Sequence, residues 1–270
     1  MASKLVLLNF SLLFSFLILI VFFSVKIQIS KPQDNSNIPK GLHISGHRFR
    51  ISERELPQKI INALNGDPEL AEAVRFHYSQ WIHDHVEAFK WDHIGAENGS
   101  FELRRRLASI LLEYNIDVLQ IFQNPTMSDI EVETKTRGIF WLYTLVKNNY
   151  KLESTIPWLN RHGFTLETAS PPSDDLFPNE YIHLTEIEIS NCKTGALQGN
   201  RKAALLLGKY YSEVEIDKEL SEYWFRIGAQ NGSPECMYYL GQIMLIKDDE
   251  LKQVRGRFWI EQAAHNGYRE

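Results

Sequence analysis

Four histidines, His77, His83, His85 and His93, lie close together in the sequence around Asp84. A His-x-His pair with a neighbouring aspartate can ligate zinc, so this group could form the metal centre of a hydrolase. However, a helix is expected to begin at Asp84, which makes Asp84 an N-cap and places His83 and His85 on either side of a turn. We therefore expect capping and surface histidines, with no metal and no cofactor. A metal-dependent hydrolase that uses these histidines is the remote alternative.

Other reactive groups give weaker signals. Arg104, Arg105 and Arg106 could contact an acidic partner, but three consecutive residues cover most of a helical turn and cannot share one face. We therefore expect these arginines to form a solvated helix surface. The sequence contains no Gly-x-Ser-x-Gly motif, no phosphate-binding glycine loop and no Cys/His pair with an orienting acid. It predicts no catalytic residues, and hence a protein that is not an enzyme.

Internal repetition is the strongest signal in the chain. The segment IGAENGS (94–100) agrees with IGAQNGS (227–233) at six of seven positions, and RGIFWLYTLVKNNY (137–150) matches RGRFWIEQAAHNGY (255–268) at both ends and in the middle. Four tryptophans each lie eight residues before a glycine or asparagine and three residues after a small residue. The tryptophans are Trp91, Trp141, Trp224 and Trp259, and the unit ends are Gly66, Gly99, Asn149, Gly199, Gly232 and Gly267, which lie 33, 50, 50, 33 and 35 residues apart.

These positions are typical of antiparallel helix pairs. A helix commonly ends on a left-handed residue, for which glycine is unpenalised and asparagine is the best tolerated alternative. Small residues such as Gly208 and Gly241 let paired helices approach closely, and a tryptophan one turn later fills the space between pairs. Because one pair cannot bury its apolar face alone, the pairs must stack into a continuous core. The predicted fold is all-α, a right-handed α-solenoid of antiparallel helix pairs.

The segment from Tyr210 to Gly241, YYSEVEIDKELSEYWFRIGAQNGSPECMYYLG, resembles the Sel-one-like repeat, a relative of the tetratricopeptide repeat, although no proline closes its second helix. The resemblance covers most of residues 55–270. Asn191 occupies the tryptophan position of one degenerate unit, and Cys192 and Cys236, which fall in different units, are expected to be buried thiols. The units are about 67–99, 100–149, 150–199 (the degenerate one), 200–232 and 233–267.

The resemblance implies a module that binds other proteins. Anchored, periplasm-facing proteins of this repeat type are similar to immunity proteins that cover the active site of a secreted toxin. An envelope scaffold or signalling adaptor is the alternative that the sequence leaves open.

Stacked repeats are expected to present an extended groove to the partner, and insertions are expected on a surface edge, at 123–129 and 171–180. The last unit ends soon after Gly267 without a capping helix. Its outer face, with Phe258 or Ile260, could therefore support self-association, unless the tail that begins at Tyr268 folds back over it. The candidate partner-binding residues are Tyr210, Tyr211, Tyr238 and Tyr239 in the groove, and Asp174, Asp175, Leu176 and Phe177 in the second insertion.

From Leu5 to Val25 the chain has 21 residues without a charge, which as a helix would extend about 30 Å, one hydrocarbon thickness. This run is longer than a signal-peptide core and no A-x-A-like site follows it. We therefore expect an uncleaved transmembrane anchor (1–26) and a flexible tether (27–54). Lysines flank the run on both sides and do not decide its orientation; a short inner tail favours a single-pass inner-membrane protein with the bulk of the chain in a bacterial periplasm.

Composition sets broader limits. With 44% hydrophobic and 23% charged residues the chain has the balance of a globular protein. Its net charge of -5 supplies no general attraction to nucleic acid, so we expect none as a partner.

Overall fold

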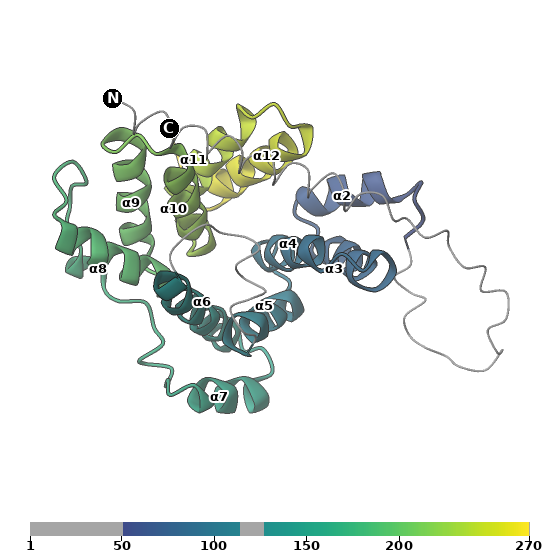
Figure 1. The fold of residues 1–270 in the computed structure, drawn as a ribbon, viewed down its shortest axis with the longest axis horizontal. Helices are drawn as coiled ribbons and strands as arrows, with labels where there is room; N and C mark the ends of the chain where they lie inside the picture. Colours follow the sequence, from purple (N-terminus) through teal and green to yellow (C-terminus); the bar gives the residue numbers. More distant parts are fainter. Residues whose placement is uncertain (1–50, 114–126, 270) are drawn as a thin grey trace, which may run out of the picture. The chain divides into compact units, whose positions relative to one another are not determined.

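The structure, a computed structural model, describes residues 51–113 and 127–269, all within one compact unit, Gly46–Glu270. The described residues form eleven α-helices and no strand, which confirms the all-α class (Figure 1). The segment Leu5–Val25 and nearly all of the predicted tether lie outside these residues. Among the described helices, none combines the length and the apolar character needed to cross a bilayer.

Most consecutive helices are joined by short connections, and longer segments separate α5 from α6 and α7 from α8. Between α3 and α4 the chain makes a π-helical turn, Tyr78–Ile82, and a 3-10 turn, Asp174–Leu176, lies between α7 and α8. The α-helices are α2 (Leu56–Leu64), α3 (Pro68–His77), α4 (His85–Glu97), α5 (Phe101–Glu113), α6 (Met127–Lys147), α7 (Leu152–Arg161), α8 (Glu186–Leu197), α9 (Arg201–Glu213), α10 (Lys218–Gln230), α11 (Pro234–Leu245) and α12 (Glu250–His265).

The six predicted unit ends all have left-handed backbone conformations. A positive φ lets the chain reverse and lets the backbone N–H groups that follow the helix bond back to its last carbonyls. The predicted ends are therefore confirmed, including the asparagine that replaces a glycine. Their φ values are 105° at Gly66, 99° at Gly99, 57° at Asn149, 105° at Gly199, 87° at Gly232 and 89° at Gly267.

Side-chain caps fix the helix starts in the same way. Asp67 accepts a hydrogen bond from the backbone N–H of Leu70, and Asn200 accepts one from that of Ala203. Each cap satisfies a backbone donor that the helix itself leaves unpaired. Caps and left-handed ends together explain why the unit boundaries can be read from the sequence.

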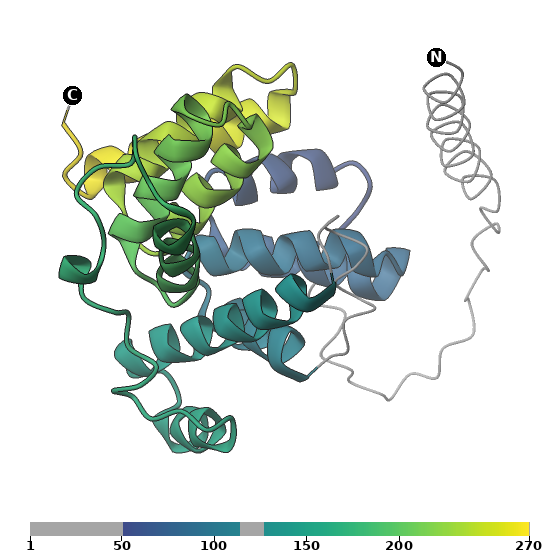
Figure 2. The same cartoon turned by 60° about the vertical axis from the view of Figure 1, so that its left-hand side comes forward.

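Four pairs of consecutive helices pack closely, and they coincide with four of the predicted units: α3 with α4, α5 with α6, α9 with α10, and α11 with α12 (Figures 1 and 2). The degenerate unit differs, because α7 packs on α6 while α8 packs on α9. All four repeat tryptophans are buried. The exposed fractions are 3% for Trp91, 3% for Trp141, 4% for Trp224 and 3% for Trp259.

The described helices divide into two halves with the same order of elements: a first half, α2 to α6, and a second half, α8 to α12. The side-chain amide of Asn98, at the end of α4, donates to the carbonyl of Ala63 at 2.7 Å. Asn231, at the end of α10, donates to the carbonyl of Ala196 at the same distance. Equivalent residues from α2 to α5 and from α8 to α11 are thus 133 positions apart, the separation of Glu97 from Gln230.

Each half packs its last helix against the first helix of the other. The ring of Phe140 on α6 would lie 2.8 Å from a Cβ at Gly199, at the end of α8, and the ring of Phe258 on α12 would lie 2.6 Å from a Cβ at Gly66, at the end of α2. Phe258 is therefore buried inside the chain rather than on a free outer face. Tyr268 stacks on Tyr238 with ring centroids 4.6 Å apart, so the tail does fold back.

Candidate functional site

Of the four tyrosines predicted to line an exposed groove, Tyr210 and Tyr211 are buried, so the prediction is wrong for these two. Tyr210 and Tyr211 are each 9% exposed, and they pack edge-to-face within the core between α9 and α10. Tyr239 is partly buried and stacks on Phe225 with centroids 5.0 Å apart. Tyr210 and Tyr211 fill the interior of their own unit, whereas Tyr239 on α11 packs against Phe225 on α10 of the preceding unit. Tyr210 and Tyr211 therefore supply packing rather than an open binding surface.

The second insertion is ordered and only partly available to a partner. Phe177 is 7% exposed, against the prediction, because its ring packs over Gly195. Lys202 donates to the carbonyls of Asp174 and Phe177 and fastens the insertion to α9. Leu176 is 71% exposed at the tip. Asp175 is exposed as well, whereas Asp174 accepts a hydrogen bond from Asn200 at 2.7 Å.

The four histidines do not converge on a metal site. In the described residues no group of three or more His, Cys, Asp or Glu side chains is arranged to hold a metal ion. Asp84 is an N-cap, as predicted, and accepts from the backbone N–H of Glu87 at 2.9 Å. His83 is left-handed at the turn with φ 58°. His93 packs edge-on against the Phe89 ring at 4.8 Å, and burial lowers its pKa to about 4.

Two buried arginines, Arg137 and Arg255, join the two halves. Neither was among the residues that the sequence singled out. The guanidinium of Arg255 on α12 donates to the carbonyl of Leu64 at 3.0 Å, to Oδ1 of Asn98 at 2.7 Å and to Oε2 of Glu97 at 2.8 Å. It also lies 4.0 Å from the centroid of the Phe258 ring. One side chain thus connects α12 with both α2 and α4.

Arg137 on α6 makes the equivalent contacts with the second half. It donates to the carbonyl of Leu197 at 3.3 Å, to Oδ1 of Asn231 at 2.8 Å and to Oε1 of Gln230 at 2.8 Å. The amide of Gln230 in turn donates to Oε1 of Glu97 at 2.8 Å, so the two equivalent residues meet each other. Both arginines begin the repeated RG-x-FW motif, which was the sequence signal for them.

The hydrogen bond from Arg255 to Glu97 is charge-assisted, because Glu97 is a carboxylate. Burial alone would raise the pKa of Glu97, but Arg255 and Arg226 outweigh it and the pKa is lowered. Burial lowers the pKa of Arg255, and the Glu97 carboxylate opposes that shift. The side chains are 5% and 7% exposed, so the pair is withdrawn from water. Such a pair depends on each partner to compensate the charge of the other.

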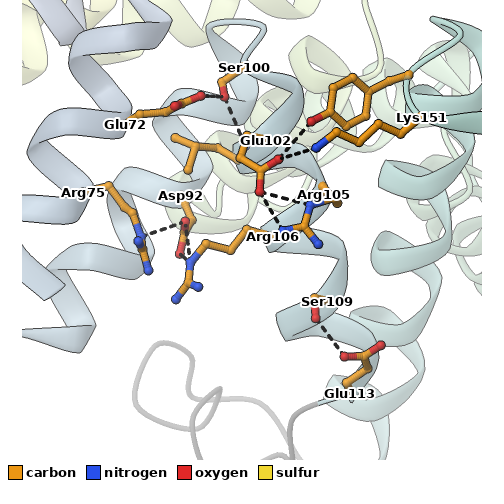
Figure 3. Close-up of polar contacts among 12 residues, drawn as sticks. Glu72, Arg75, Asp92, Ser100, Glu102, Arg105, Arg106, Ser109, Glu113 and Lys151 are labelled. Carbon is orange, nitrogen blue, oxygen red and sulfur yellow. Dashed lines mark hydrogen bonds and ion pairs between the residues drawn. The ribbon is translucent and has the colours of Figure 1, made fainter. Parts of the chain in front are cut away.

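A second charged group lies away from this junction, in the first half (Figure 3). Arg75 on α3, Asp92 on α4 and Arg106 on α5 form what we term the charge cluster. Asp92 is 1% exposed, and its Oδ1 atom lies 3.4 Å from Nε of Arg75 and 3.1 Å from Nε of Arg106. Burial raises the pKa of Asp92 to about 6, although Arg106 and Arg75 both act to lower it. The arginine side chains are 13% and 43% exposed respectively.

The second half has apolar residues at the three equivalent positions, Gly208, Phe225 and Tyr239. A Cβ at Gly208 would lie 2.5 Å from the Phe225 ring, and this ring stacks on Tyr239. The same packing position is therefore filled by stacked rings in one half and by three charges in the other. At this position the first half departs chemically from the repeat.

The three consecutive arginines diverge, as predicted, but they are not simply solvated. Arg104 donates to the carbonyl of Ala96 at 3.0 Å, and Arg106 belongs to the charge cluster. Arg105 pairs with Glu102 at 2.6 Å. A hydrogen bond from Arg105, more than the further contacts with Tyr150 and Lys151, holds the pKa of Glu102 at about 2.

Cys192 and Cys236 are buried and unbonded, as predicted. Burial raises their pKa values to about 11 and about 12, so both remain protonated thiols.

No protein-family model matches the chain, and no curated protein or solved structure matches it either.

Proposed function

We propose that the chain is a non-enzymatic module that binds another protein, built as a right-handed α-solenoid of Sel-one-like repeats. The observation that carries this proposal is the recurrence of the same helix-pair packing 133 residues later, down to the Asn98 and Asn231 contacts. Repeated helix pairs of this kind form scaffolds whose outer residues vary freely while the packing positions stay fixed. That separation of roles suits recognition of a protein partner.

Buried ionisable groups outside the charge cluster support the non-enzymatic part of the proposal, because they have packing roles. Arg255 and Glu97 connect three helices, and His93 packs against an aromatic ring. The Cys236 sulfur fits beneath Gly228. Structural networks of this kind perturb pKa values without chemistry.

For the location, we propose that Leu5–Val25 anchors the protein in the inner membrane of a bacterium and that the repeats face the periplasm. The length and apolar character of that segment support this location. For the partner, we propose a secreted toxin that the repeat surface occludes, so that the protein confers immunity. This step rests on the resemblance to repeat proteins with that role.

The test is a protection assay joined to cross-linking in living cells. The full chain is expressed with each product of its neighbouring genes, and growth is measured. We expect one neighbour-encoded toxin to arrest growth alone and to be neutralised by this chain, with cross-links between the two proteins. A variant with Ile187→Asp, at an exposed position that belongs neither to the charge cluster nor to the candidate partner-binding residues, serves as a folded surface control.

Two outcomes would contradict the proposal. Cross-links to a resident envelope protein, with no protection against any neighbour, would favour the scaffold or adaptor. Turnover of a substrate by the purified chain, abolished by His85→Ala with unchanged thermal stability, would show an enzyme.

A further inference from the structure

We propose that Arg75 and Arg106 form a docking site for an acidic side chain of the partner protein, with Asp92 as the buried group that holds both guanidiniums in place. The inference rests on the proposed function, since it names the chemistry by which the repeat surface recognises its partner.

The two halves of the chain fill this packing position differently. Stacked apolar rings fill the equivalent position of the second half, so this fold has a purely apolar solution for that contact. Replacing buried ion pairs by well-packed apolar residues is often neutral or stabilising. The charge cluster is therefore not needed for packing. Local rules broken without a structural gain are expected at functional sites.

The two guanidiniums each approach Asp92 through a single nitrogen. Arg75 approaches Asp92 through Nε at 3.4 Å, and Arg106 approaches it through Nε at 3.1 and 3.2 Å. Among the described residues, none accepts a hydrogen bond from the terminal nitrogens of Arg75 or Arg106. Figure 3 shows these terminal nitrogens on the same side of Asp92, pointing away from it. The paired N–H donors of a planar guanidinium match the two oxygens of a carboxylate.

The charge cluster is accessible from solvent through Arg106 and has a net positive charge. Arg106 is 43% exposed and can meet a group that arrives from solvent, whereas Arg75, at 13%, lies deeper at the base of the site. The neighbouring Arg105 is already paired with Glu102, so it adds little free positive charge. Two arginines and one ionised aspartate carry a single net positive charge. A singly charged carboxylate neutralises that charge, whereas a doubly charged phosphate would leave the occupied site with a net negative charge.

The experiment measures binding of a fluorescent hexaglutamate peptide to the full-length chain in neutral detergent at low salt. Arg106→Gln should weaken binding about tenfold or more, the effect of one lost charge-assisted hydrogen bond. The matched control is Arg105→Gln, which lies on the same helix with the same 43% exposure. It should change the affinity by less than about twofold, because exposed ion pairs contribute little. Equal losses in both variants would show non-specific attraction and overturn the site.

A competition arm separates the sources of negative charge. Acetate should displace the peptide at lower concentrations than inorganic phosphate does. Stronger competition by phosphate would overturn the assignment to an acidic side chain and indicate a phosphate site instead.

A triple variant copies the second half into the first: Arg75→Gly, Asp92→Phe and Arg106→Tyr. It should keep the helical content of the parent, bind no peptide and give no protection in cells. A triple variant that still captures the partner would overturn the docking site while leaving the proposed function intact. Conversely, Arg106-dependent peptide binding in a chain that captures no partner would support the site and refute the proposed function. If the triple variant does not fold, the Arg106→Gln arm decides.

Discussion

Removing the Arg255 side-chain charge tests whether the contact between the two ends of the described chain stabilises the fold. In Arg255→Met, the apolar stem still packs on Phe258, but the hydrogen bonds to Leu64, Asn98 and Glu97 are lost. Glu97, with a side chain 7% exposed, would keep its charge without this partner. Breaking a buried pair by removing one partner costs about 3–5 kcal/mol. We therefore expect the free energy of unfolding to fall by about that amount.

The assay is urea unfolding of the full chain, followed by circular dichroism. Arg257→Met, an exposed position two residues along the same helix, should change the free energy of unfolding by less than about 0.5 kcal/mol. Adding Glu97→Gln to Arg255→Met should recover part of the loss, because the position then matches the neutral Gln230 of the other half. An Arg255→Met variant as stable as the parent would refute the reasoning that the two ends are joined.

Further predictions concern packing, backbone and pH. Trp224→Ala should lower the free energy of unfolding by about 3–5 kcal/mol in the same assay, since the ring is 4% exposed. Gly232→Val should cost more than about 1 kcal/mol through left-handed strain at φ 87°, and Gly232→Asn should cost less; equal midpoints for both would oppose this. The pKa of His93 is lowered from 6.5 to about 4, so the folded state should lose stability as the pH falls from 6.5 towards 4, and His93→Gln should remove that part of the slope. The pKa of Asp92 is raised from 3.8 to about 6, so the free energy of unfolding should fall as the pH rises from 3.8 to 6. In Asp92→Asn this part of the pH dependence should be absent.

Local rules explain why so much of the helix-pair organisation could be predicted from the sequence. A left-handed helix end requires glycine or asparagine, so Gly99 and Asn149 mark boundaries without any knowledge of tertiary structure. Trp91 and Trp224 recur at fixed spacing because each fills the same gap between helices. The solenoid and the membrane anchor remain predictions, and the anchor lies outside the described residues.

Contacts distant in the sequence could not be predicted in the same way. Nothing near Phe258 indicates that Gly66 covers it, because the two residues come from opposite ends of the described chain. Tyr210 was predicted to be exposed but is buried. A tyrosine that packs inside a helix pair and one that lines a groove occur at the same helical spacing, so the sequence does not distinguish them.

The charge cluster was missed for a related reason. The run of three arginines predicts a solvated helix surface that includes Arg106. The partner of Arg106, Asp92, comes from the preceding helix, so it is not evident from the neighbouring sequence. Only the 133-residue correspondence between the two halves identifies Phe225 as the counterpart of Asp92.

The central structural claim, that the last helix pair packs back on the first helix, is tested most directly by the distance between spin labels on α2 and α12. Labels at Asn65→Cys and Arg257→Cys occupy exposed positions, and the native thiols are buried and protonated, so they do not compete. We predict a narrow distribution centred at the separation of neighbouring helices, whose axes lie about 8–10 Å apart, and a broader one in Arg255→Met. A broad distribution centred far beyond that separation in the parent chain would contradict the account.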